Sequence, residues 1–116
     1  MIQRVVARLS AMAEETRLRI MLRLRDGECD VSTLAQELDV AQASISRHLA
    51  VLKQVGLVSV ERHGRHAVCR VADESIYEIC AHVCDGVRRH VAREQEAVGL
   101  KPRRRQPVKR SGKAGK

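Results

Sequence analysis

Apolar residues recur every three or four positions over several stretches of the chain, which is the spacing of an amphipathic helix. In residues 2–12, one face carries the apolar side chains of Ile2, Val5, Val6 and Leu9. In residues 15–25, arginines occupy the polar side. Asp30 can cap a short helix that follows it, and Gly56 ends a longer one. The pattern therefore predicts helices over residues 2–12, 15–25, 31–38, 42–54 and 73–97.

The period changes from helical to alternating after the fourth helix. Apolar and polar residues alternate over 57–62 and again over 66–72, and His63-Gly64 stands between the two runs. Alternation on both sides of a glycine-containing turn is the signature of a β-hairpin. We expect Ala67, Cys69 and Val71 to lie on one face of the second strand, with Cys69 in the core.

The charge of the chain is concentrated at its C-terminus. The net charge is +8, and residues 101–116 hold eight basic residues and no acidic one. The 14 basic residues that remain in 1–100 are balanced by the chain's 14 acidic residues. We therefore expect one domain over residues 1–100 and a basic, disordered tail over 101–116, which serves either as a nucleic-acid arm or as a solvated tail.

Residues 31–54 have the proportions of a helix-turn-helix. The second helix opens with short and polar side chains, "QASISRH", which suit an end that approaches the bases and phosphates of the major groove. Its start lacks the usual Ser or Thr cap, because Ala41 stands there. Within it, Gln42 can pair with adenine and Arg47 with guanine or phosphate.

The hairpin tip "ERHGRH" is basic and can serve as a wing against the DNA backbone or minor groove. Residues 40–72 contain five basic residues and only one acidic residue, Glu61. This region is therefore positively charged, although residues 1–100 are neutral overall. The helix and the hairpin together give the predicted DNA-binding residues Gln42, Ser44, Ser46, Arg47, His48, Arg62, His63 and Arg65.

The segment from Glu15 to Asp73 resembles the ArsR/SmtB family of bacterial repressors, most closely in "TRLRI" and "ISRHLAVLKQVGLV". The resemblance covers residues 4–95. It implies a mainly α fold with a small β-hairpin, a winged helix-turn-helix that dimerises through its first and last helices. It also implies a repressor that binds a DNA operator and is released by an inducer, often a metal or metalloid ion. Because a symmetric dimer presents two recognition helices, we expect the operator to be an imperfect palindrome.

Two ion sites of that family are not intact in this chain. The cysteine positions of the metalloid site fall on Asp30 and Ser32, with Cys29 one residue out of register. The zinc site of the last helix matches at Asp73, but its other positions fall on Ser75, Gly86 and Arg89. An inducer of this chain must therefore use other residues.

Cys80 and Cys84 lie four residues apart and share one face of the last predicted helix. They can hold a soft ion such as As(III) or Sb(III), with Cys29, expected in an exposed polar turn, as a third ligand. Two alternatives stay open: the thiols respond to oxidants or persulfides, or they are packing residues.

The sequence argues against an enzyme, because it contains no Gly-rich phosphate loop, no H-E-x-x-H and no nucleophile elbow. It contains no signal peptide and no apolar run of the length that spans a membrane, so we expect a cytoplasmic protein with reduced thiols. The alternative to a DNA-binding repressor is a helical interaction module whose tail binds acidic partners or RNA.

Overall fold

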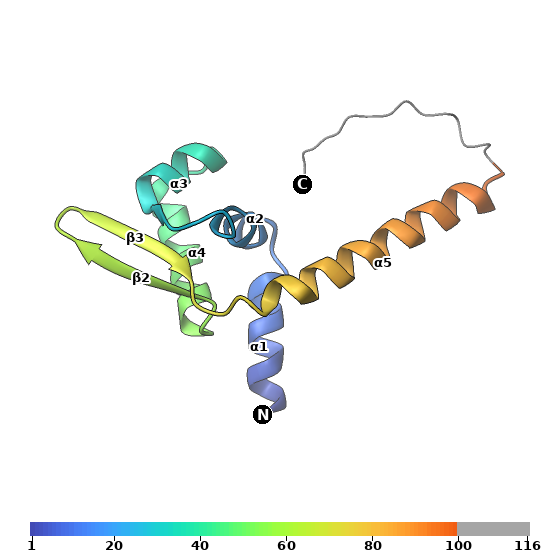
Figure 1. Cartoon of the computed structure of the whole chain (residues 1–116), viewed down its shortest axis with the longest axis horizontal. Coiled ribbons are helices and arrows are strands. Elements are labelled where there is room, and N and C mark those ends of the chain that lie inside the picture. The colour runs from blue at the N-terminus through green and yellow to red at the C-terminus, as the bar shows by residue number, and fades with distance from the viewer. Residues whose placement is uncertain (100–116) are drawn as a thin grey trace. The chain divides into compact units, whose positions relative to one another are not determined.

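The computed structural model describes residues 1–99, and the predicted basic tail lies outside the described residues (Figure 1). Every predicted helix and both predicted strands are present, with bounds close to those expected. The last helix begins at Ile76 rather than at residue 73, because Asp73 accepts hydrogen bonds from the backbone N–H and the hydroxyl of Ser75 and forms a turn before the helix. The elements in order are α1 (Ile2–Met12), α2 (Glu15–Leu24), β1 (Cys29–Asp30), α3 (Val31–Leu38), α4 (Gln42–Gln54), β2 (Val58–His63), β3 (His66–Val71) and α5 (Ile76–Ala97).

One strand was not predicted. Cys29 and Asp30 form β1, which pairs with β3 and makes an antiparallel sheet with the strand order β1-β3-β2. The expectation that Cys29 occupies an exposed turn is therefore wrong, because Cys29 lies in a strand and is only 6% exposed. The strand is two residues long, too short to show any alternation in the sequence.

The hairpin β2–β3 closes through a two-residue turn at Gly64-Arg65, since His63 pairs with His66 in the register. Gly64 has φ 66°, a left-handed conformation that glycine adopts without strain. Two-residue turns with glycine first match the right-handed twist of the flanking strands.

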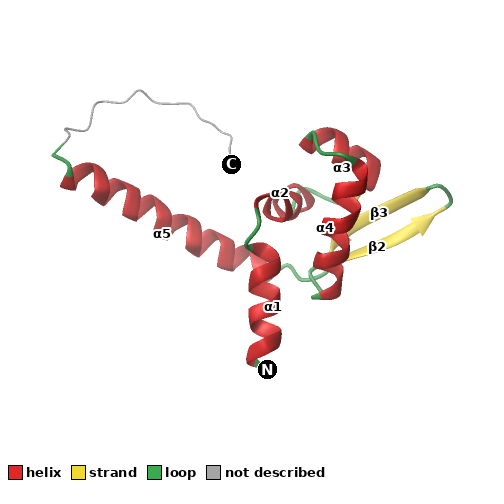
Figure 2. Cartoon of the chain, turned by 180° about the vertical axis from the view of Figure 1, so that it is seen from behind, coloured by secondary structure: helices red, strands yellow, loops and turns green. Residues whose placement is uncertain are grey.

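Helices α2, α3 and α4 lie beside the hairpin strands (Figure 2). The core among these elements is aliphatic. This agrees with a chain that contains no Phe or Trp. Cys69 is completely buried, which confirms its predicted place in the core. The largest fully buried side chains are those of Ile20, Met21, Leu34, Ile45, Leu52, Leu57 and Cys69.

The chain divides into two compact units, residues 1–76 and a second that begins at Tyr77. The first carries the helix-turn-helix and the sheet. In the second, α5 exposes a stripe of valines and an isoleucine at four-residue spacing, namely Ile79, Val83, Val87 and Val91. Within residues 1–99, no helix has the length and apolar character that crossing a membrane would require.

Candidate nucleic-acid interface

The α3–α4 pair presents the start of α4 to solvent. The two helices pack against each other, and Asp39 between them adopts a left-handed conformation that turns the chain sharply. Ala41 offers only its backbone carbonyl at the start of α4, as the sequence predicted, and no side chain caps the helix. The first turn of α4 therefore has free backbone N–H groups beside exposed polar side chains.

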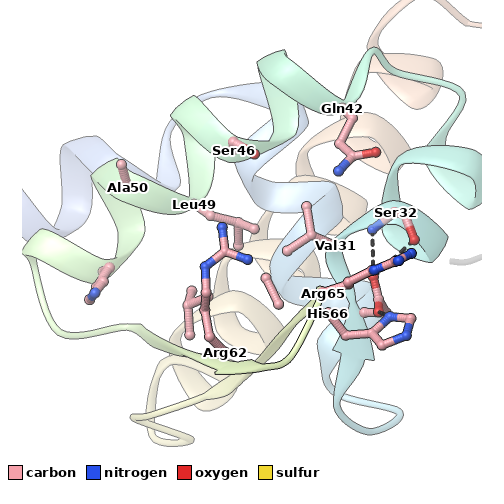
Figure 3. Close-up of a pocket in the computed structure, with 13 residues that line it drawn as sticks. Val31, Ser32, Gln42, Ser46, Leu49, Ala50, Arg62, Arg65 and His66 are labelled. Carbon is pink, nitrogen blue, oxygen red and sulfur yellow. Dashed lines mark hydrogen bonds and ion pairs between the residues drawn. The ribbon is translucent and has the colours of Figure 1, made fainter.

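A groove of about 520 Å³ runs between α4 and the hairpin, and the start of α3 closes one end (Figure 3). Four of the predicted DNA-binding residues line it: Gln42 and Ser46 come from α4, and Arg62 and Arg65 from the hairpin. Sequence segments 20 residues apart are thus brought to one surface. The complete lining is Asp30, Val31, Ser32, Gln42, Ser46, Leu49, Ala50, Lys53, Val60, Arg62, Arg65, His66 and Ala67.

The groove holds positive charge that the protein does not neutralise. Within residues 1–99, the side chains of Lys53, Arg62 and Arg65 form no hydrogen bond or ion pair, and neither does the exposed side chain of Arg47 on α4. Arg70 is different, because its guanidinium lies 3.2 Å from Glu28 and 3.3 Å from Glu61. At this surface, the cations available to an anionic partner are therefore those of α4 and the hairpin tip.

Three other predicted residues lie away from the groove or are already engaged. His48 faces α2, where its Nδ1 lies 3.2 Å from Arg17 Nη1 and 3.7 Å from a carboxylate oxygen of Glu14. His63 is exposed at the end of β2, with its Nε2 3.4 Å from Glu61. Ser44 is half-buried on α4 and does not line the groove.

Asp30 joins α3 to the hairpin at the end of the groove. Its carboxylate accepts hydrogen bonds from the backbone N–H and hydroxyl of Ser32, both at 2.9 Å, and lies 2.6 Å from His66 Nδ1. The Ser32 backbone N–H, then its hydroxyl, and His66 hold the pKa of Asp30 below its ordinary value. Asp30 thus fixes the tip end of the hairpin, at the start of β3, against the helix-turn-helix.

Four polar or charged lining residues were missing from the predicted set: Asp30, Ser32, Lys53 and His66. Lys53 could have been found from the helical period, because it lies on the same face of α4 as Gln42, Ser46 and Leu49. Asp30 and Ser32 reach the groove because β1 pairs with β3, and the sequence carries no signal for that pairing. His66 belongs to the hairpin tip that the sequence marked as a wing, although it was not included in the predicted set.

The cysteines fall into two pairs. Cys80 is half-buried and Cys84 is exposed on α5, while Cys29 and Cys69 are buried in the sheet. Within residues 1–99, no three His, Cys, Asp or Glu side chains are grouped so that they could hold a metal ion.

Comparison with known proteins places this geometry in a family. Residues 14–60 match the family model described as "Bacterial regulatory protein, arsR family". The chain is 39% identical over 71 residues to the HTH-type transcriptional repressor SmtB of Mycobacterium tuberculosis, a match that covers 61% of this chain and 53% of that protein. It is 35% identical over 75 residues to the HTH-type transcriptional regulator NmtR of the same organism, covering 65% of this chain and 62% of the relative. The matches thus span little more than half the length of these relatives.

Solved structures agree in fold over a larger share of their length. HlyU from Vibrio cholerae superposes with a TM-score of 0.63 at 30% identity, and the match covers 70% of this chain and 88% of that one. The homodimeric winged helix-turn-helix DNA-binding domain of a possible ArsR-family regulator from Mycobacterium bovis gives 0.69 at 29% identity, with 78% and 83% covered. Because the matched residues include the helix-turn-helix and most of the groove, the chain belongs to the ArsR family of bacterial regulatory proteins and has its winged helix-turn-helix fold.

Proposed function

We propose that this protein is a transcriptional repressor that binds duplex DNA as a homodimer. The observation that carries the proposal is the groove between α4 and the hairpin, where Lys53, Arg62 and Arg65 have no acidic partner among the described residues. Phosphate contacts supply much of the affinity of DNA-binding proteins, and unpaired cations on one face favour them. The relatives named as regulators support this function over the interaction-module alternative.

In the proposed complex the start of α4 enters the major groove. Gln42 and Arg47 read base edges, Gln42 pairing with adenine and Arg47 with guanine. Ser44 and Ser46 are short enough to let the helix approach closely. Arg62, His63 and Arg65 follow the sugar-phosphate backbone from the hairpin. His48 supports the helix from the side of α2 rather than contacting DNA.

The exposed apolar stripes favour a second copy of the chain as partner. Ile2 and Val6 of α1 are 74% and 54% exposed, and Val83 and Val87 of α5 are 59% and 55% exposed. Apolar stripes of this kind are usually covered in a soluble regulator, and the M. bovis structure is described as homodimeric. A symmetric dimer presents two α4 helices to an operator with matching symmetry.

The inducer we propose is a soft, thiol-binding ion such as As(III) or Sb(III), held by Cys80 and Cys84. The two thiols are one helical turn apart on α5, and the second is exposed. Cys29, the third ligand expected from the sequence, is buried in β1, so its use would require β1 to leave the sheet. The same two thiols could instead respond to an oxidant or persulfide.

The test is a binding and release experiment on the DNA upstream of the protein's own gene. The full chain should bind this fragment far more tightly than a shuffled duplex of equal length and composition. Arsenite or antimonite should release it, and Cys80→Ser and Cys84→Ser should each abolish that release without loss of DNA binding. Equal affinity for both duplexes would reject a specific regulator. Release by peroxide or persulfide alone would select the redox alternative.

A promoter reporter tests the direction of regulation, because one relative, HlyU of V. cholerae, is named an activator. We expect repression without inducer, and activation would overturn the assignment.

A further inference from the structure

A second pair of cysteines lies in the sheet, apart from the DNA interface and from the α5 thiols. Cys29 of β1 and Cys69 of β3 are direct partners in the antiparallel register. Residues in direct register project to the same face of a sheet, so the two side chains are neighbours. They are 6% and 0% exposed. Neither the proposed DNA contacts nor the proposed inducer site accounts for this pair.

The surroundings keep both thiols protonated. Burial raises the pKa of Cys69 to about 11 and also raises the pKa of Cys29. Cys69 Sγ–H donates to the backbone carbonyl of Cys29 at 3.1 Å, and Cys29 Sγ–H donates to the carbonyl of Asp30 at 3.5 Å. Such thiols are poor nucleophiles toward oxidants, because the thiolate is the reactive form.

Spacing favours a bridging ion over a disulfide. Direct cross-strand partners have Cβ atoms about 4.5–5.5 Å apart. A disulfide requires about 3.5–4.5 Å between the same atoms. Two metal–sulfur bonds of about 2.3 Å each, the length known for zinc, would separate the sulfurs of a linear site by about 4.6 Å, far more than the roughly 2.05 Å between the sulfurs of a disulfide. An ion between the two sulfurs therefore does not require the Cβ atoms to come closer than the cross-strand spacing, as a disulfide does.

Charge and ligand number then select the ion. Within residues 1–99 no third His, Cys, Asp or Glu joins these thiols in a metal-binding group, which disfavours zinc with its four ligands. A monovalent ion between two thiolates would leave a net negative charge in the core, whereas a divalent ion leaves none. The ion must therefore be soft and divalent, and it must bind stably with a coordination number of two.

We propose that Cys29 and Cys69 form a two-coordinate binding site for Hg²⁺. On binding, each thiol releases its S–H proton to solvent and forms one Hg–S bond, so two protons leave for each ion and no electron is transferred. The product is electrically neutral and suits its buried place. The site is reached from the sheet edge, because β1 is a two-residue edge strand that follows the exposed residues 25–28.

The experiment uses the full chain with Cys80→Ser and Cys84→Ser, so that only the sheet thiols remain. The reduced protein, freed of reductant, is titrated with HgCl₂, and uptake is followed by native mass spectrometry and by proton release in weak buffer. We expect one Hg²⁺ per chain and about two protons per ion. A tenfold excess of Zn²⁺ should displace none of it. No DNA is present, so failure here is distinguishable from failure of the proposed repressor function.

Two further variants decide whether both thiols are needed. Cys29→Ala and Cys69→Val, each in the same background, should lose the stoichiometric site; valine is chosen because it keeps an apolar, strand-forming side chain in the core. Circular dichroism checks that each variant folds. Should either fail to fold, the parent is labelled with a maleimide in denaturant after loading, and both thiols should be protected. No uptake, uptake that survives loss of either thiol, or one Hg²⁺ shared by two chains would each overturn the proposal.

Discussion

At the scale of single residues, Arg8 connects three parts of the first unit. Its guanidinium donates to the carboxylate of Asp73, ahead of α5, and to the backbone carbonyl of Val55 at 2.6 Å, at the end of α4. Gly56 makes the approach possible, because a Cβ at that position would lie 2.8 Å from Arg8 Nη2. Gly56 also has φ 81°, so glycine is favoured there on two grounds.

Arg8→Met should therefore destabilise the protein although Arg8 is partly exposed. Methionine keeps much of the aliphatic stem, but the Val55 carbonyl loses this donor and the Asp73 carboxylate keeps only its hydrogen bonds from Ser75. We expect a loss of about 1–2 kcal/mol in the free energy of unfolding, measured by urea denaturation. Arg4→Met, at an exposed position of α1 without an ion pair among residues 1–99, is the matched control. Equal effects of the two substitutions would show that the Arg8 contacts contribute nothing.

Substitutions of base-reading residues and of phosphate-binding residues should differ in how they change the dependence of DNA affinity on base sequence and on salt concentration. Gln42→Ala and Arg47→Ala should each weaken operator binding by about 1–3 kcal/mol and reduce the preference for the operator. Arg65→Ala should weaken binding to all duplexes alike and lower the salt slope by about one unit. Arg19→Ala, which removes an arginine from α2 that pairs with Glu15, should leave both quantities unchanged. An Arg65 variant with altered sequence preference and an unchanged salt slope would reverse the assignments.

At the scale of elements, α4 begins without a side-chain cap. Ala41 has the extended conformation of a cap residue, φ −57° and ψ 138°, but no oxygen that could accept from the first turn. Ala41→Ser supplies that oxygen and should raise the free energy of unfolding by about 1 kcal/mol. Ala43→Ser, two positions farther on in the same exposed turn, should give no gain, because a serine inside a helix cannot cap it. Thermal or urea unfolding that ranked the two variants equally would contradict the argument.

The cap of α3 should make stability depend on pH. The Ser32 backbone N–H and hydroxyl, with His66, hold the pKa of Asp30 below its ordinary value of 3.8. Because the folded-state pKa is depressed, the stabilisation is present above the unfolded-state pKa and is lost as the pH falls through the folded-state pKa.

Asp30→Asn tests this dependence and keeps a good cap residue in place. Between about pH 5 and pH 3 its free energy of unfolding should fall less steeply than that of the parent. Glu74→Gln removes an exposed carboxylate that has no hydrogen bond within residues 1–99, and it should retain the parent's slope. Parallel curves for the parent and Asp30→Asn would exclude a contribution from this carboxylate.

The elements were predictable wherever a period ran over several residues. The helical stripe located α4, and alternation around Gly64 located the hairpin. The strand β1 was not predictable, because two residues carry no period and their pairing with β3 spans 40 positions. The helical period also places His48 on α4, but it does not show that the side chain faces α2, because packing between the two helices decides that direction.

At the scale of the whole molecule, the exposed stripe of α5 is the surface that the proposed dimer would cover. Ile79, Val83, Val87 and Val91 recur every four residues along one face and are between 44% and 59% exposed. Apolar side chains contribute roughly 1.5–3 kcal/mol each when they pass from full exposure to full burial, so even partial burial of such a stripe in a dimer is a substantial free energy. A charge placed in its middle should oppose association more than the same charge placed on the opposite side of the helix.

Val83→Glu should therefore yield a monomer in sedimentation at micromolar concentration, and operator affinity should fall with dimerisation. Arg89→Glu puts the same side chain on the other side of α5 and should leave the dimer intact.

In such a dimer both α4 helices enter major grooves on one side of the duplex, about 34 Å or one helical turn apart. The operator should therefore be an imperfect palindrome with half-sites about 10 base pairs apart or a multiple of that. Inserting five base pairs between the half-sites rotates one by half a turn and should abolish cooperative binding, whereas inserting ten restores the facing. A Val83→Glu monomer that bound the operator as tightly as the parent would show that one α4 helix suffices, and the symmetry argument for this protein would fail.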